Sequence, residues 1–101
     1  MKMLIKLLMG HAIADFALQS DWIAINKNRH FNKTPVNWQY VMAAHALIHG
    51  AAVTAITGRV SLGVAETVCH FLIDCGKCES WFGIHVDQTA HIVCKIAWCL
   101  L

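Results

Sequence analysis

Charged residues are scarce in this 101-residue chain, where Asp, Glu, Lys and Arg together make up 14% of the sequence. Soluble domains usually carry roughly 25%. The formal net charge is only +2, and no basic segment is interleaved with aromatic residues, so we exclude a nucleic-acid-binding protein. No stretch alternates polar and apolar residues in the way a strand does. The sequence therefore predicts an all-α fold, and its length predicts a single domain over residues 1–101.

Cysteine is present in an odd number, five, which argues against a closed disulfide framework. Cys75 and Cys78 form a lone C-x-x-C pair, whereas a structural zinc site normally closes with four ligands. We interpret the pair as small apolar packing residues near a helix end. The apolar run after Lys2 resembles a signal peptide, but polar residues interrupt it and no cleavage site follows. We expect it to be a retained first helix.

Hydrophobic residues make up 57% of the chain and gather in four long segments, over about 3–19, 38–57, 61–75 and 84–101. Gly58 and Gly76 are typical helix-stop signals. Residues 21–26 extend the first segment as a short piece that Ser20 can cap, and residues 26–37 form a loop. The segments approach the roughly 17–25 residues that a spanning helix needs. Short connections indicate antiparallel neighbours, so we predict a four-helix transmembrane bundle in the bacterial inner membrane. The distribution of Lys and Arg favours a cytoplasmic location for the 26–37 loop.

Each apolar segment carries two metal-ligand residue types spaced four positions apart, which places them on one face of a helix. Unpaired buried charges are very costly, so these polar residues need compensation inside the bundle. At a rise of about 1.5 Å per residue, the aspartates lie at one depth and most of the histidines about one turn deeper. The eight candidate metal ligands are His11, Asp15, His45, His49, His70, Asp74, Asp87 and His91.

A mixed histidine and carboxylate cage suits zinc, with manganese or iron as alternatives, because calcium and magnesium prefer oxygen ligands alone. Eight ligands exceed the needs of one tetrahedral ion, so we expect two divalent ions about 3.5–4 Å apart. Gln19 and Gln88 flank the ligands and are candidates to hydrogen-bond them. Lys77 is a candidate to hold a ligand carboxylate or an anionic substrate, and Lys95 is a candidate partner for Glu66. A buried ion-pair network without metal is the alternative interpretation.

These motifs resemble a known family when they are taken together in order. They are His11-x-x-x-Asp15, His45-x-x-x-His49, His70-x-x-x-Asp74 and Asp87-Gln88-x-x-His91. The chain resembles the small bacterial and phage membrane proteins of domain of unknown function 3307. That family is similar in layout to inner-membrane metal-dependent hydrolases. The resemblance implies a metal-dependent membrane hydrolase, and it is compatible with a phage-encoded protein.

Three functions remain open from the sequence. The first is hydrolysis of a lipid or lipid-linked phosphate or ester, with Glu66 or a ligand aspartate as proton acceptor. The second is a non-enzymatic, metal-stabilised membrane bundle that binds a host protein or lipid. The third is ion or proton passage, which requires a homo-oligomer because four short helices leave little room for a pore. An open coordination position favours the first function, and closed coordination by the protein favours the second.

Overall fold

The computed structural model describes residues 2–101, and every regular element in this range is a helix. This confirms the all-α prediction. The elements are α1 (Lys2–Ala12), the π-helical η1 (Ile13–Ala17), α2 (Asp21–Asn26), α3 (Trp38–Thr57), α4 (Val60–Cys78) and α5 (Ile84–Leu100).

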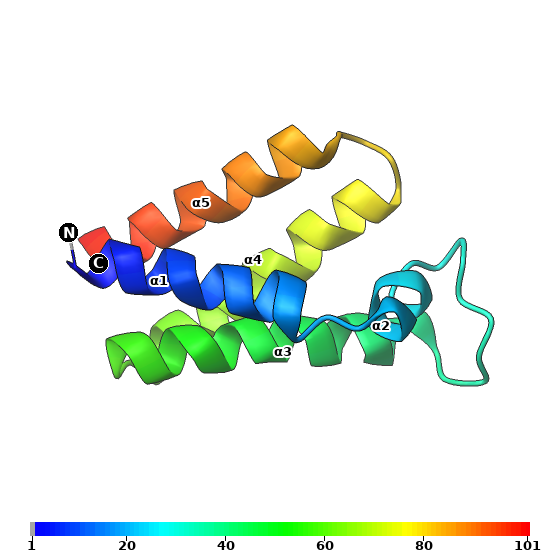
Figure 1. The fold of residues 1–101 in the computed structure, drawn as a ribbon, viewed down its shortest axis with the longest axis horizontal. Coiled ribbons are helices and arrows are strands. Elements are labelled where there is room, and N and C mark those ends of the chain that lie inside the picture. The colour runs from blue at the N-terminus through cyan, green and yellow to red at the C-terminus, as the bar shows by residue number, and fades with distance from the viewer. Residues whose placement is uncertain (1) are drawn as a thin grey trace.

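The four long helices form the sides of an elongated bundle measuring 41 × 23 × 21 Å (Figure 1). α3 packs against α4, α4 against α5, α5 against α1, and α1 against α3, so each helix contacts two neighbours. Neighbouring helices run in opposite directions, and both chain ends lie at the same end of the bundle (Figure 1). α2 and the loop that follows it lie at the other end. The antiparallel four-helix arrangement is the one that short connections predicted.

Several helix ends lie where the sequence placed them. Ser20 caps α2, since its Oγ accepts a hydrogen bond of 3.3 Å from the backbone N–H of Ile23. Gly58 ends α3 with a left-handed φ of 71°, which favours glycine. The predicted stop at Gly76 is wrong, because α4 continues to Cys78. A Cβ at Gly76 would lie 2.6 Å from the ring of Phe82, so this glycine makes room for the α4–α5 turn.

A close contact between two backbones fixes α3 against α4. A Cβ at Gly50 would lie 2.7 Å from the backbone oxygen of Gly63, and a Cβ at Gly63 would lie 2.7 Å from that of Gly50. No other residue type fits at such a separation without moving the helices apart. This crossing brings the histidines of α3 close to those of α4.

The interior is polar over much of its length, and the outside is largely apolar. A small apolar core of Leu7, Val53 and Leu62 lies among the helices. The other buried side chains include histidines, carboxylates and Lys95. Among the helices of residues 2–101, α3 alone is long and apolar enough to cross a membrane. Four spanning helices therefore remain a prediction.

Candidate metal centre

Six of the eight predicted ligands meet inside the bundle, in two groups that share one histidine. The first group is Asp15, His45, His49 and His70, and the second is His70, Asp74 and His91. In each group, one ligand atom from every residue lies within 4.8 Å of all the others. The groups draw on η1, α3, α4 and α5, so all four sides of the bundle contribute.

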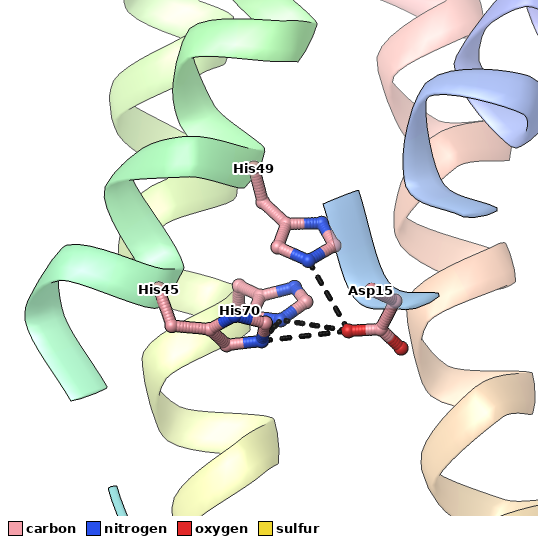
Figure 2. A group of neighbouring side chains, drawn as sticks. All are labelled: Asp15, His45, His49 and His70. Atoms are coloured by element: carbon pink, nitrogen blue, oxygen red, sulfur yellow. Dashed lines mark hydrogen bonds and ion pairs between the residues drawn. The ribbon is translucent and has the colours of Figure 1, made fainter. Parts of the chain in front are cut away.

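The first group surrounds Oδ1 of Asp15, as Figure 2 shows. This oxygen lies 3.2 Å from Nε2 of His49, 3.4 Å from Nε2 of His45 and 3.9 Å from Nε2 of His70. The Nε2 atoms of His45 and His70 are themselves 3.2 Å apart. In a tetrahedral zinc site with bonds of about 2.0–2.1 Å, neighbouring ligand atoms are about 3.3–3.4 Å apart. The donor atoms of the first group therefore have the spacing that such an ion requires.

A π-helical turn carries Asp15 to this position. The backbone N–H of Leu18 bonds the carbonyl of Ile13 at 2.9 Å, which is the i→i+5 pattern that inserts an extra residue into a helical turn. Such turns occur frequently at functional sites. The helix ends directly afterwards, so Asp15 lies close to the end of the segment.

The second group lies on the α4–α5 side. Oδ1 of Asp74 is 3.2 Å from Nε2 of His91, and Oδ2 is 3.5 Å from Nε2 of His70. Because Nε2 of an imidazole has one lone pair, His70 can bind only one ion at a time. The nearest further ligand is Asp87, whose Oδ1 lies 3.4 Å from Nε2 of His91.

Two of the buried ligand atoms have no hydrogen-bond partner within residues 2–101, namely Nε2 of His49 and Oδ1 of Asp87. Nε2 of His49 is near Asp15 but in an orientation that makes no hydrogen bond. Buried polar atoms are normally paired. A cation between the ligands would satisfy both atoms, so the donor set fits a metal better than it fits a closed hydrogen-bond network.

His11 and Asp87 are predicted ligands that lie beside the two groups and not within them. Gln88 connects them to the cluster. Its Oε1 lies 3.0 Å from Nε2 of His11, and its Nε2 donates to Asp15 at 3.2 Å and to Asp87 at 3.1 Å. The expectation that Gln88 hydrogen-bonds the ligands is confirmed. Gln19 is bonded instead to the backbone carbonyl of Asp15, at 3.2 Å.

A buried ion pair lies one helical turn beyond the ligands. Lys95 donates to Oε1 of Glu66, as the four-residue spacing from His91 suggested, and both side chains are only 1% exposed. The indole N–H of Trp98 donates to Oε2 of Glu66 at 2.7 Å, a contact that the sequence did not indicate. Oε1 of Glu66 also lies 3.4 Å from Nδ1 of His70. Glu66 thus lies behind His70, on the side away from the ligands.

A lysine that the sequence interpretation missed reaches the cluster from outside the bundle. Nζ of Lys27, at the end of α2, donates to Oδ2 of Asp74 at 2.7 Å. We predicted this role for Lys77, which is exposed. Lys77 is on the same helix as Asp74, whereas Lys27 is 47 residues away, and only the folded loop brings it near. The many Asn residues that stabilise this loop are the signal that could have indicated a fixed position.

The same loop is attached to the end of α4. The guanidinium of Arg29 makes two hydrogen bonds to the Glu79 carboxylate, and Nε2 of His30 lies 2.9 Å from it. Hydrogen bonds from Arg29 and then from His30 lower the pKa of Glu79 to about 2, and Glu79 in turn raises the pKa of Arg29. The side chain of Asn28 also contacts the carbonyl of Cys78, at 3.5 Å. The five cysteines are free thiols, as expected for packing residues.

The sequence matches the family described as "Protein of unknown function (DUF3307)" over residues 3–101, nearly the whole chain. No curated protein and no solved structure matches it.

Proposed function

The chain belongs to this family of unknown function, and we propose from the site itself that it is a membrane-embedded, metal-dependent hydrolase of a lipid or lipid-linked phosphate or ester. The observation that carries the proposal is a group of four ligand atoms next to a second, incomplete group. Four protein ligands close a tetrahedral ion, whereas three leave a position for water. Bound to the second group, a divalent ion would lower the pKa of such a water to near 7.

The proposed ligand assignment gives His70 to the first ion. The second position then consists of Asp74, His91 and Asp87, three side chains that are all at most 4% exposed. Zinc is the proposed metal at both positions, since the donors are imidazole and carboxylate, and manganese or iron would accept the same donors. His11 lies close to both positions and holds its orientation through Gln88.

Membrane location is supported by the inverted arrangement of α4. Its exposed side chains at four-residue intervals are Val60, Val64, Val68 and Leu72. Its buried positions include Glu66, His70 and Asp74. A helix on the surface of a soluble protein has the opposite arrangement. Apolar exteriors with ionisable residues facing the bundle interior are the pattern of membrane proteins. We propose that the four long helices span the bacterial inner membrane together.

The test is metal content, measured by mass spectrometry on protein purified in mild detergent. We expect about two equivalents of zinc, manganese or iron in the wild type. His49→Ala should remove the first ion and Asp87→Ala the second, while Lys33→Gln, an exposed loop position, should keep both. Hydrolysis of lipid phosphates and esters is then assayed with the loaded protein. Folded wild-type protein without metal would refute the proposal.

A second candidate function is a metal-stabilised bundle without catalysis, and the closed first group favours it. Four protein ligands are typical of structural zinc, whose binding energy is folding energy. If chelation unfolds the bundle, and the loaded protein with both ions hydrolyses none of the lipid phosphates or esters, this second function is preferred.

A further inference from the structure

Lys27 is an unusual neighbour for a metal ligand, because its ammonium group competes with a cation for the same oxygen. Oδ2 of Asp74 receives Lys27 Nζ at 2.7 Å and also lies 3.2 Å from Nε2 of His45. The Lys27 side chain is 12% exposed and that of Asp74 is 5% exposed. The lysine therefore lies at the rim of the cluster, on the side of α2 and the following loop.

The loop that carries Lys27 holds it in place. Asn26, directly before it, is buried, and its Oδ1 accepts a hydrogen bond of 3.1 Å from the backbone N–H of Lys33. Asn32 donates to the carbonyl of Asn26 at 2.7 Å. Arg29 attaches the same loop to Glu79. The position of Lys27 is thus fixed by contacts on both sides, in contrast to a mobile surface lysine.

The charge balance of the interior points to the kind of ligand. The carboxylates of Asp15, Glu66, Asp74 and Asp87 face the ammonium groups of Lys27 and Lys95, which leaves a formal charge of −2. One divalent ion balances this charge, and two leave an excess of +2. Excess charge away from water needs a counter-ion. A dianion entering beside the second ion would supply it, whereas a neutral carboxylic ester would not.

We propose that Lys27 and the Asp74–His91–Asp87 position together bind the phosphoryl dianion of the substrate, so that the substrate class is a phosphate monoester of a lipid. The inference rests on the proposed function. Lys27 would exchange its bond to Asp74 for one to a phosphoryl oxygen, because Asp74 then faces the ion. In the reaction, a water oxygen bonds to phosphorus while the bond from phosphorus to the lipid oxygen breaks. One water proton passes to the lipid oxygen, which yields a lipid alcohol and hydrogen phosphate.

Binding of inorganic phosphate to manganese-loaded protein in detergent is the first test, read from the ³¹P relaxation that the bound manganese enhances. We expect Lys27→Gln to weaken phosphate binding about tenfold or more, since a charge-assisted hydrogen bond is lost. Lys27→Arg should stay close to the wild type. Lys33→Gln, in the same loop and exposed, is the matched control and should not change binding. Metal content is measured in every sample.

Vesicles containing phosphatidic acid, a phosphate monoester, or phosphatidylcholine, a diester without net charge, form the second test. We expect release of phosphate from phosphatidic acid alone, reduced in Lys27→Gln and retained in Lys33→Gln. If metal-loaded wild type binds no phosphate, or if Lys27→Gln binds as the wild type does, this inference is wrong while the proposed function stands. Phosphate that binds when free but is not released from phosphatidic acid would refute the lipid monoester as substrate. A wild type without metal overturns the proposed function itself.

Discussion

At the scale of single residues, Glu66 shows how a buried charge can serve a site without touching its ligand atoms. It accepts hydrogen bonds from Lys95 and Trp98 and lies 3.4 Å from Nδ1 of His70. Groups behind a ligating histidine orient its ring, and their loss typically lowers metal affinity 10–100-fold. Glu66 is thus a positioning residue in this site.

Replacement of this residue separates its two roles. Glu66→Gln leaves the Lys95 charge buried without its partner, which should lower the free energy of unfolding by about 3 kcal/mol or more. The double variant Glu66→Gln with Lys95→Met removes that charge and should recover much of the stability. Thermal unfolding in detergent and competition titration with zinc measure the two effects. A double variant with wild-type zinc affinity would show that the pair has only a structural role.

Glu79 provides a pH dependence outside the helices. Its pKa falls from an ordinary value of 4.5 to about 2, because Arg29 and His30 bond the ionised form. The stabilisation is therefore complete above about pH 5 and is lost as the pH falls from 4.5 through 2. We expect amide hydrogens of residues 27–37 to exchange faster over this range, after correction for intrinsic rates. Glu79→Gln should exchange fast at every pH, and a variant with unchanged pH dependence would contradict this assignment.

At the scale of elements, the contact of α3 with α4 determines whether the histidines can meet. Gly63→Ala places a methyl group 2.7 Å from the backbone oxygen of Gly50, so the helices must separate. Overpacking of this kind typically costs about 1–3 kcal/mol. We expect lower thermal stability and the loss of the first metal ion, whose ligands lie on both helices. Gly83→Ala is the matched control, because a Cβ there meets nothing within 4 Å. Equal effects of the two variants would remove this explanation.

The spacing of residues along each helix made much of the site predictable. His45 and His49, or His70 and Asp74, lie on one face of a helix whatever the tertiary structure, and four such faces in a bundle must look inward together. The π-helical turn at Asp15 was not predictable, since no residue type specifies it. Nor was Lys27, because its contact with Asp74 depends on a loop whose path is set by tertiary hydrogen bonds. Gly76 misled the analysis because a glycine that makes room for an aromatic ring looks the same in sequence as a helix stop.

At the scale of the whole molecule, the outward side chains resolve a conflict between the helix criterion and the fold. α3 meets the criterion for a membrane span by itself. α4 carries Glu66 and Asp74, and α5 has 17 residues. Hydropathy along a helix counts these carboxylates as though they faced the lipid, yet both lie inside the bundle. What lipid contacts is the exterior, and on α4 that exterior is a row of valines and a leucine.

This distinction predicts different effects for two valines of similar exposure. Val68 lies on the outward face of α4, and Val36 lies in the loop between α2 and α3. A lysine at the centre of a spanning helix costs roughly 2.5–3.5 kcal/mol of insertion free energy, and a lysine in a loop outside the bilayer costs little. We expect Val68→Lys to reduce the carbonate-resistant, membrane-integrated fraction strongly and Val36→Lys to leave it unchanged. A wild type extracted by carbonate as a folded monomer, or a Val68→Lys variant that integrates normally, would exclude α4 from the bilayer and with it a lipid-embedded active site.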